Sequence, residues 1–463
     1  MGNLFQKFYR LYFTVAFLLL LNSCAVKKPP VEEDLYEAAF ANFILPSTWQ
    51  NSVDTTAINE NWLSTFDDEL LDTLVSEALI YNPDLRMSSA RVEESQGYVQ
   101  AAQAALRPAL SILGRETNKL GGNLGGGLNG ALFAASWELD IWGELRNARN
   151  AEESNLAASE AELSFARLSL AAQVARSYYL ASETYLQIEL AKQMIAISEK
   201  MRELSKKRFD VGIGTEIDFM VSEANLNRLK DALKQLELGY NNQLRALELL
   251  LGRYPSAEIE VKNALAEITT KIPTGIPVQV LERRPDVLAA QYRFNAAFYR
   301  VGEAEAAKLP NLNLTGGFGF IDSELMNLRS EFSNPIRSIG GELMAPIYQG
   351  GKLRANVVVR NAQQKQAVEM YSRTVLNALA DVENALEEVE TVDNREQFLA
   401  VAVSSNERAF ELEQQRYRVG IADMRDLITQ QMDLFRSEID LLRLRGEKIV
   451  QRINLFVALG GSM

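Results

Sequence analysis

The stretch that decides the fold runs from Glu144 to Val211 and reads ELRNARNAEESNLAASEAELSFARLSLAAQVARSYYLASETYLQIELAKQMIAISEKMRELSKKRFDV. These 68 residues contain neither Gly nor Pro. A second run of 68 residues without Gly or Pro, 352–419, begins 208 positions later. Because an α-helix rises about 1.5 Å per residue, either run would form a helix roughly 100 Å long, which is longer than a globular core is deep.

The two runs belong to a duplicated half. The first ends in RFDVG at 208–212 and the second in RYRVG at 416–420. Upstream of the runs, NPDL at 82–85 and RPDV at 284–287 are 202 positions apart. A repeat of this size predicts one architecture built from two equivalent halves, although length alone would suggest about three domains.

The repeat gives a plan for the whole chain. Its expected parts are a lipoprotein signal peptide at 1–23, a lipidated arm at 24–61, a first repeat at 62–252, an equatorial linker at 253–277 and a second repeat at 278–463. We expect each repeat to contain two strands, one long helix and a tight tip, namely 109–116, 131–141, 144–211 and 212–214 in the first and 311–320, 338–347, 352–419 and 420–422 in the second.

Composition excludes several functions. The chain has no histidine and one cysteine, so the usual zinc patterns, imidazole-dependent triads and any disulfide within one chain are absent. The formal net charge of −13 argues against a nucleic-acid partner. We therefore expect that the protein is not an enzyme and that it has no catalytic residues, no metal-binding residues and no cofactor. Catalysis by carboxylates alone is not excluded by the composition.

The N-terminus has the features of an export signal. Lys7 and Arg10 precede an apolar run, 11–21, which is too short to span a bilayer. The signal ends in LNSC at 21–24, which resembles the bacterial lipobox. That resemblance implies an S-diacylglycerol and an N-acyl chain on Cys24, and several acyl chains would anchor the N-terminus stably. The alternative is an ordinary secretory signal with an incidental cysteine.

The strand candidates alternate with a period of two. In 311–320 one face carries Leu312, Leu314, Gly316, Phe318 and Phe320. Segments of about ten residues with one apolar face are typical of a membrane β-barrel, although an ordinary sheet over a soluble core is the alternative. Four strands cannot close a barrel, and open edges in lipid leave backbone groups unpaired. Three copies would supply twelve strands.

The helix lengths fit a bundle of long rods. In the first half, helices expected over 84–106 and 215–251 together cover most of the long helix, and 285–308 and 423–459 do the same in the second half. Apolar residues along the rods keep helical or heptad intervals, which we interpret as helix packing. The expected fold is therefore mainly α, with long coiled-coil helices and a small membrane barrel.

Specific motifs carry a resemblance to a known family. They are the lipobox, the doubled tip, ERRPDV at 282–287 with Gly302 and Pro310 downstream, WGELR at 142–146 and PIYQGG at 346–351. Together they resemble the TolC-like outer-membrane efflux factors, in particular the NodT-type lipoprotein branch. The resemblance covers nearly all of the mature chain, from Trp62 to Gly460.

The resemblance implies a passive exit duct of a tripartite efflux system. Its expected form is a homotrimer anchored by lipid in the outer membrane, with a twelve-stranded barrel there and a helical tunnel through the periplasm. The implied partners are a periplasmic adaptor protein, outer-membrane lipid and an inner-membrane pump, for example of the resistance-nodulation-division type.

The family also suggests where the tunnel narrows. A ring of aspartates lies just past the second tip in these proteins, and the matching residue here is Asp426, with Asp218 as its counterpart in the first half. The family often has another acid three residues later, where this chain has Thr429, so Asp423 is the alternative source of charge. Each aspartate has a structural alternative, in which it caps a helix or stabilises the helix dipole.

The tips present a second set of candidates, Arg208, Gly212, Arg416 and Gly420. The glycines permit positive φ and a sharp reversal, which is a sufficient structural reason for them. The family adds a function, because its members meet the helical hairpins of the adaptor at this end.

Two other classes of protein remain alternatives. A periplasmic adaptor lipoprotein would carry one helical hairpin flanked by β domains, whereas this chain has two copies. A structural coiled-coil envelope protein would explain the long helices but not strands with one apolar face.

Overall fold

The computed structural model describes residues 39–40, 46–50, 62–115, 129–267, 272–323, 328–329 and 335–461. Cys24, the predicted lipidation site, and the predicted signal peptide lie outside the described residues. The described part of the arm includes Trp49, which is 3% exposed and donates from Nε1 to the carbonyl oxygen of Thr274 at 3.2 Å. The arm is therefore packed against the linker at this point.

The chain forms two compact units, and each takes segments from both repeats. Among the described residues, the first unit contains 39–40, 90–115, 129–161, 288–323, 328–329 and 335–374, and the second contains 46–50, 62–89, 162–267, 272–287 and 375–461. The boundaries between the units therefore differ from the boundary between the repeats. Each unit is consequently built by pairing equivalent parts of the two repeats.

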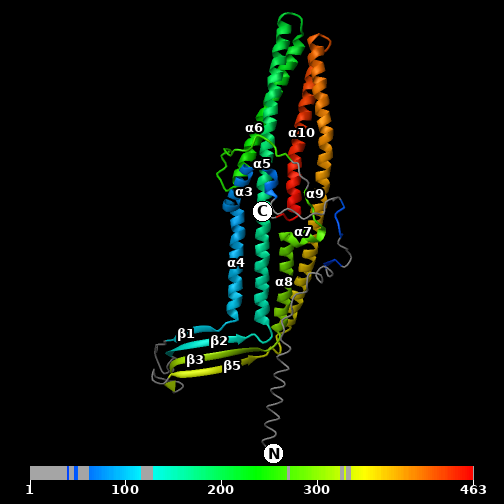
Figure 1. Ribbon diagram of the computed structural model, residues 1–463. Coiled ribbons are helices and arrows are strands. Elements are labelled where there is room, and N and C mark those ends of the chain that lie inside the picture. Colours follow the sequence, from blue (N-terminus) through cyan, green and yellow to red (C-terminus); the bar gives the residue numbers. More distant parts are fainter. Residues whose placement is uncertain are drawn as a thin grey trace, which may run out of the picture. The chain divides into compact units, whose positions relative to one another are not determined.

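The helices and strands keep the labels of Figure 1. In chain order they are the 3-10 helix η1 (Leu63–Phe66), α3 (Glu69–Tyr81), α4 (Pro83–Ala105), β1 (Ala109–Arg115), β2 (Asn129–Leu139), α5 (Glu144–Asp210), α6 (Glu216–Leu250), α7 (Pro277–Arg283), α8 (Pro285–Ala306), β3 (Asn311–Ser323), β4 (Leu328–Arg329), β5 (Ile336–Met344), α9 (Lys352–Arg418) and α10 (Met424–Ala458). Each long helix ends one residue before the bound expected from the sequence.

Each long helix ends in a glycine turn. The N–H of Gly212 donates to the carbonyl of Phe209 at 3.0 Å, and that of Ile213 donates to the carbonyl of Arg208 at 2.9 Å. This is the Schellman pattern, which needs a left-handed residue after the helix, and Gly212 has φ +77°. The same pattern recurs at Gly420, where φ is +82°. The glycines at the tips are thus required by backbone geometry.

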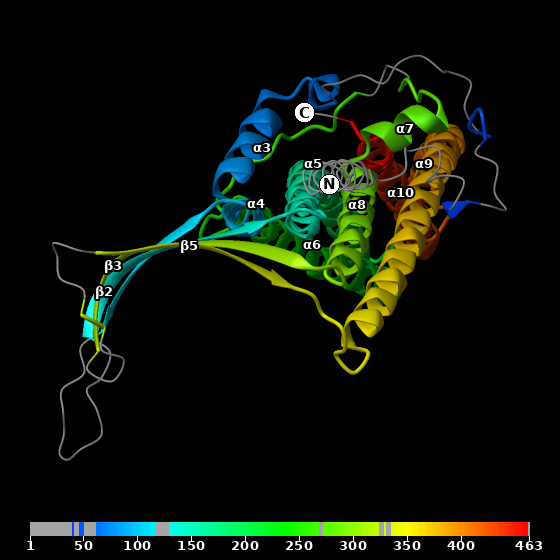
Figure 2. The ribbon, with the colours of Figure 1, turned by 90° about the horizontal axis from the view of Figure 1, so that it is seen from below.

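The sheet in the first unit is antiparallel. β2 pairs with β1 and β3, and β3 pairs with β5 and, at its end, with the short β4. Phe133 lies opposite Ile112 on one side and opposite Phe318 on the other. Because directly opposite residues share a face, the alternating apolar residues of neighbouring strands come together. Figure 2 views this sheet as a single curved layer.

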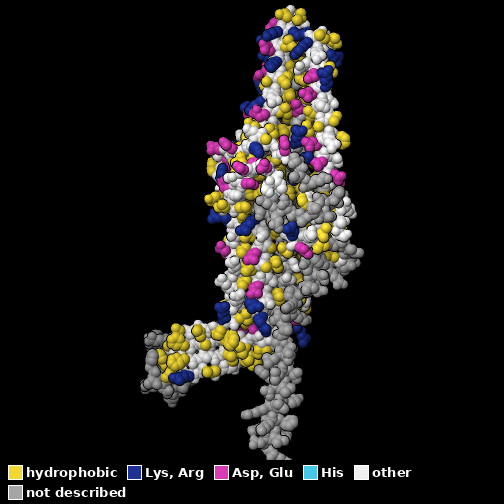
Figure 3. Space-filling view, in the orientation of Figure 1, with side chains coloured by type: hydrophobic (Ala, Val, Ile, Leu, Met, Phe, Trp, Pro, Cys, Tyr) yellow, Lys and Arg dark blue, Asp and Glu magenta, His cyan; other side chains and the backbone are white. Residues whose placement is uncertain are grey.

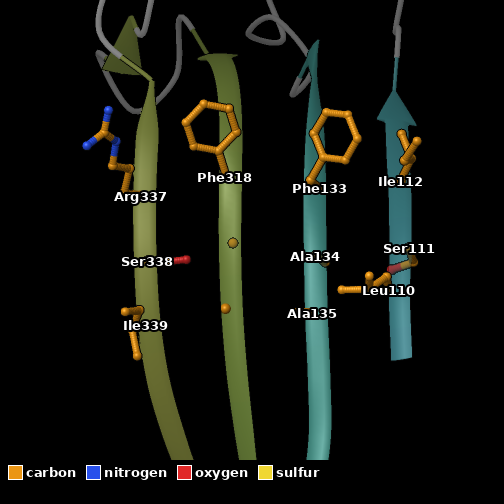
Figure 4. A pocket seen from close by; sticks show the side chains of 12 residues that line it. Leu110, Ser111, Ile112, Phe133, Ala134, Ala135, Phe318, Arg337, Ser338 and Ile339 are labelled. Carbon is orange, nitrogen blue, oxygen red and sulfur yellow. The ribbon is translucent and has the colours of Figure 1, made fainter. Parts of the chain in front are cut away.

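The apolar face of the sheet is uncovered in a single chain. Phe133, Phe318 and Ile339 are 56%, 49% and 98% exposed. Figure 3 shows hydrophobic side chains over the visible side of the sheet, and Figure 4 shows Phe133 and Phe318 side by side in a hollow that Ile112 and Ile339 also line. No soluble core covers these side chains among the described residues, as the alternative interpretation would require.

Two strands end earlier than the sequence pattern suggested. The strand expected over 131–141 stops at Leu139, because the carboxylate of Asp140 accepts the N–H groups of Leu145 (3.1 Å) and Arg146 (2.9 Å) and so starts α5. The strand expected over 338–347 stops at Met344, two residues before a proline that has no N–H for a ladder bond. The short β4 was not expected at all.

An aromatic core holds the second unit together where η1 meets α5 and α10. Trp62 is fully buried and packs on Phe456 and Phe66, with ring centroids 6.0 and 6.1 Å apart. Phe66 in turn lies 5.6 Å from Tyr179 of α5. Residues at the beginning and the end of the described chain thus share one core.

The linker after α6 is held by one buried carboxylate. Glu248 is 2% exposed, and its carboxylate accepts the backbone N–H groups of Ala257, Glu258 and Ile259 at 2.7, 2.9 and 3.3 Å and the hydroxyl of Ser256 at 3.3 Å. Burial acts to raise the pKa of Glu248, but these hydrogen bonds outweigh it, and the pKa lies below its usual value. The charged form is therefore the one that anchors the linker.

We predict that Glu248→Gln lowers the unfolding temperature at pH 7, corresponding to a loss of about 2 kcal/mol. A depressed pKa gives stability that is fully present above the ordinary glutamate pKa of about 4.3 and is lost as the pH falls through the lower folded value. The difference from wild type should therefore shrink below about pH 4. Thermal unfolding followed by circular dichroism between pH 7 and pH 3 measures it, with Glu258→Gln on the same loop as the control. A pH-independent difference would contradict the assignment.

Candidate functional site

The two tips belong to the second unit and share one small core. Its buried members come from three long helices, and one partly buried residue adds the fourth. They are Met201 of α5, Phe410 and Tyr417 of α9, and Met424, Leu427, Ile428 and Leu434 of α10, with Val221 of α6 packed against them. This core positions the second tip and the start of α6, because Arg416, Gly420, Asp423, Asp426 and Asp218 each lie within four residues of one of its members.

Asp423 is the N-cap of α10. Its carboxylate oxygen accepts the N–H of Arg425 at 2.8 Å and that of Asp426 at 2.9 Å. In the first half Thr215 occupies the equivalent position and accepts the N–H of Asp218 at 3.1 Å. Asp423 therefore caps α10, which is the structural alternative to a role in the pore, because its carboxylate is hydrogen-bonded to the first N–H groups of the helix.

Asp426 is exposed in the first turn of α10. Within the part of the chain that the structure describes, its carboxylate has no hydrogen-bond or ion-pair partner. Its charge is favourable beside the positive end of the helix dipole but is otherwise uncommitted. The carboxylate of Asp426, unlike that of Asp423, is therefore not engaged by the described part of the helix end.

The charge of Asp218 acts on a contact between the hairpin of α5 and α6 and the hairpin of α9 and α10. The guanidinium of Arg208 in α5 stacks over the ring of Tyr417 in α9, 5.0 Å from its centroid. Burial raises the pKa of the Tyr417 hydroxyl, Arg208 opposes the rise, and the nearby Asp218 adds to it. The structure therefore places Arg208 on the ring of Tyr417, with the charge of Asp218 near enough to raise the pKa of that hydroxyl. Sequence reasoning did not single out Tyr417.

The remaining tip residues are open to a partner. Arg416 is exposed and pairs with Glu413 of the preceding turn at 2.9 Å. A Cβ added to Gly212 or Gly420 would meet nothing within 4 Å, so both turns face open space. Each tip glycine is flanked by exposed apolar side chains, which are Val211 (69%), Ile213 (68%), Val419 (70%) and Ile421 (71%). The repeated Val-Gly-Ile triplet is a sequence signal that could have identified them.

The motifs that carry the resemblance meet each other in space. In the first unit Trp142 donates from Nε1 to the carbonyl of Pro310 at 2.7 Å. A Cβ on Gly302 would lie 2.8 Å from Oδ1 of Asn147, so α8 needs glycine to approach α5. In the second unit Arg284 is 5% exposed and donates to Asp286 at 2.8 Å and to the carbonyl of Ala458 at 3.0 Å. These motifs are therefore helix contacts.

The described residues contain no group of three or more His, Cys, Asp or Glu side chains arranged to hold a metal ion. Among those same residues, no helix combines the length and the apolar character needed to cross a bilayer.

A duplicated chain with long paired helices and an apolar-faced sheet defines the class of outer-membrane channel proteins. The family model described as outer membrane efflux protein matches residues 74–253 and 276–461. The chain belongs to this family, as the sequence motifs indicated, and it is an efflux channel of the outer membrane.

Individual relatives cover almost the whole chain. CusC, a cation efflux system protein of Escherichia coli O6:H1, is 29% identical over 423 residues, covering 87% of this chain and 88% of CusC. OpmQ, a pyoverdine export outer membrane protein of Pseudomonas putida, is 28% identical over 462 residues, covering 96% of both chains. The crystal structure of VceC from Vibrio cholerae superposes with a TM-score of 0.79 at 25% identity, covering 88% of this chain and 100% of VceC.

We predict that Asp423→Ala loosens the first turn of α10, whereas Asp426→Ala does not. Loss of an N-cap costs about 1 kcal/mol, so amide hydrogen exchange at 425–427 should become about fivefold faster. Asp426 interacts only with the dipole, so its removal should change this exchange by less than about twofold. Exchange measured by mass spectrometry on the purified protein decides the matter. Equal effects of the two substitutions would contradict the different roles.

Proposed function

We propose that this chain is the exit duct of a tripartite efflux system, a passive trimeric conduit gated at its helical tips. The observation that carries the proposal is the sheet, whose apolar face is uncovered. Within the described residues, β1 and β5 each pair on one side only. Because a spanning sheet in lipid must leave no edge unpaired, β1 of one copy is expected to pair with β5 of the next. Three copies would close a barrel of twelve strands.

The proposed gate is a ring of Asp426 carboxylates at the periplasmic entrance. One uncommitted carboxylate from each copy would give three negative charges around a narrow opening. Like charges drawn close together repel each other and attract cations, so the ring would resist narrowing and favour cation passage. Asp423 and Asp218 would support the gate indirectly, since Asp423 caps α10 and the charge of Asp218 acts on Tyr417, where α5 and α9 meet.

The proposed partners are an adaptor protein in the periplasm, a pump in the inner membrane and the lipid of the outer membrane. The exposed apolar residues at the tips suit a helical adaptor protein, which would connect the duct to an inner-membrane pump. A diacylglycerol and an N-acyl chain on Cys24 would add a lipid anchor in the outer membrane. The relatives CusC and OpmQ are named for cations and for pyoverdine, which are chemically unlike cargoes. We therefore place the choice of cargo in the pump and adaptor.

Planar-bilayer recording of the purified trimer tests the conduit and its gate. Asp426→Ala should lower the ratio of cation to anion permeability by about twofold or more, because three charges leave the entrance. Asp440→Ala removes the same charge from an exposed position farther along α10 and should have a smaller effect. Wild-type currents from Asp426→Ala would contradict the gate, and a protein without channel steps would contradict the conduit.

Crosslinking tests the docking of an adaptor at the tips. Gly212→Cys or Gly420→Cys is expected to strain a left-handed turn, so the neighbouring exposed positions Val211→Cys and Val419→Cys are the better probes. With a co-expressed adaptor, both should form crosslinked products. Tyr254→Cys, exposed on the linker, is the control and should give little product. Capture only from the linker would contradict docking at the tips.

A further inference from the structure

A glutamine near the tips of the second unit is completely buried. Gln431 of α10 is 0% exposed. Its Nε2 donates to the carbonyl oxygen of Met194 in α5 at 3.2 Å, and its Oε1 accepts from Nδ2 of Asn225 in α6 at 3.2 Å. One amide therefore connects α10 of the second repeat to both helices of the first hairpin.

Asn225 completes the connection. It is 1% exposed, and its Nδ2 also donates to the hydroxyl of Ser198 in α5 at 3.2 Å. Its Oδ1 accepts from Arg228 at 3.4 Å. Both amides thus have hydrogen-bond partners at nitrogen and oxygen, which removes the penalty of burying them. We call Ser198, Asn225, Gln431 and the carbonyl of Met194 the amide lock.

The amide lock lies next to an apolar core, and this contrast gives it a physical consequence. Leu427, Ile428 and Leu434 on the same helix belong to the apolar core of the tips. Apolar side chains can exchange neighbours at small cost, whereas the hydrogen bonds of the amide lock form at only one position of α10. A shift of α10 by one residue moves Gln431 by about 1.5 Å and turns it by about 100°, which breaks its hydrogen bonds and leaves buried amides unpaired. Buried amides set the register of coiled coils in the same way.

The duplicated fold does not require this lock. At the offset of 208, Gln431 corresponds to Glu223, which is half-exposed and forms an ion pair with Arg202 at 2.5 Å. Asn225 corresponds to Asp433, which lies 3.6 Å from Arg436 in an exposed ion pair. The first hairpin, α5 and α6, therefore forms without a buried amide at the position equivalent to Gln431. The second hairpin, α9 and α10, forms without one at the position equivalent to Asn225. What the lock adds is a fixed pairing between the two hairpins.

We propose that Gln431 and Asn225 are positioning residues that set the register of α10 against α5 and α6 and thereby hold Asp426 at the channel entrance. Asp426 precedes Gln431 by five residues, or about 7.5 Å along the same helix, so their heights are rigidly coupled. The inference rests on the proposed role of Asp426 in the gate. The lock acts through helix position and need not contact the transported solute.

The decisive variant replaces both amides, as Asn225→Leu with Gln431→Leu. The double substitution removes both buried amides together, so neither is left without the other as its partner, and apolar replacement of paired buried polar groups is often neutral or stabilising. The unfolding temperature should therefore stay at or above the wild-type value. The register is then no longer fixed, so Asp426 leaves the entrance in part of the population, and the ratio of cation to anion permeability should fall by up to the roughly twofold loss expected of Asp426→Ala. A merely structural network would not separate these two readouts.

A distance measurement reports on the register without relying on conduction. Spin labels on Val211→Cys and Val419→Cys place one probe on each tip. The double leucine variant should broaden the distribution of label distances, whereas Gln430→Leu, the adjacent glutamine outside the lock, should leave it unchanged. If the double variant does not assemble, Gln431→Met removes the same bonds at similar volume and should broaden the distribution too.

The outcomes separate the inference from the proposed function. A wild-type distance distribution in the leucine variant, or in Gln431→Met where that is used, would overturn the register role. A broadened distribution with a wild-type ratio of cation to anion permeability would overturn the link to the entrance while leaving the register role intact. Failure of the wild-type protein to conduct would contradict the proposed conduit. The label distances would still show whether the two amides set the register of α10.

Discussion

Backbone pairing at the two outer strands is the constraint on which the rest of the structure depends. β1 and β5 each have one partner within the described residues, and the face between them presents Phe133 and Phe318 to the surroundings. Lipid satisfies the apolar side chains but not the edge N–H and C=O groups. Only further strands can pair those groups, so the sheet and its need for other copies have one physical origin.

Much of the fold could be predicted because its signals are local. The long helices were visible as runs without Gly or Pro, and α5 and α9 end where Gly212 and Gly420 supply a left-handed residue. The strand faces followed from the alternation of apolar residues. The strand ends did not, because Asp140 looks like part of the alternation and only its bonds to the start of α5 show that it caps a helix.

The candidate site was harder to predict from the sequence, because residues of the same type have different contacts in the structure. Asp423 and Asp426 are both acids near the second tip, but only the structure shows that the first is bonded to backbone N–H groups. Arg208 was predicted to be a docking residue at the tip, and its stacking on Tyr417 joins residues 209 positions apart in the chain. Gln431 resembles a surface glutamine in sequence, since partners from α5 and α6 are needed to bury it.

The two repeats end in equivalent ways but with different chemistry. Glu248 near the end of α6 corresponds to Phe456 near the end of α10, and they hold the linker and Trp62 respectively. Beyond Phe456, a Cβ on Gly461 would lie 3.5 Å from Cδ1 of Trp62. Packing therefore brings the end of the second repeat beside the start of the first, in addition to their connection through the linker. A circularly permuted polypeptide, opened in the linker beyond Ile259 and joined from 461 to 62, would keep the contacts of Glu248 and of Trp62, so these contacts do not depend on which half comes first.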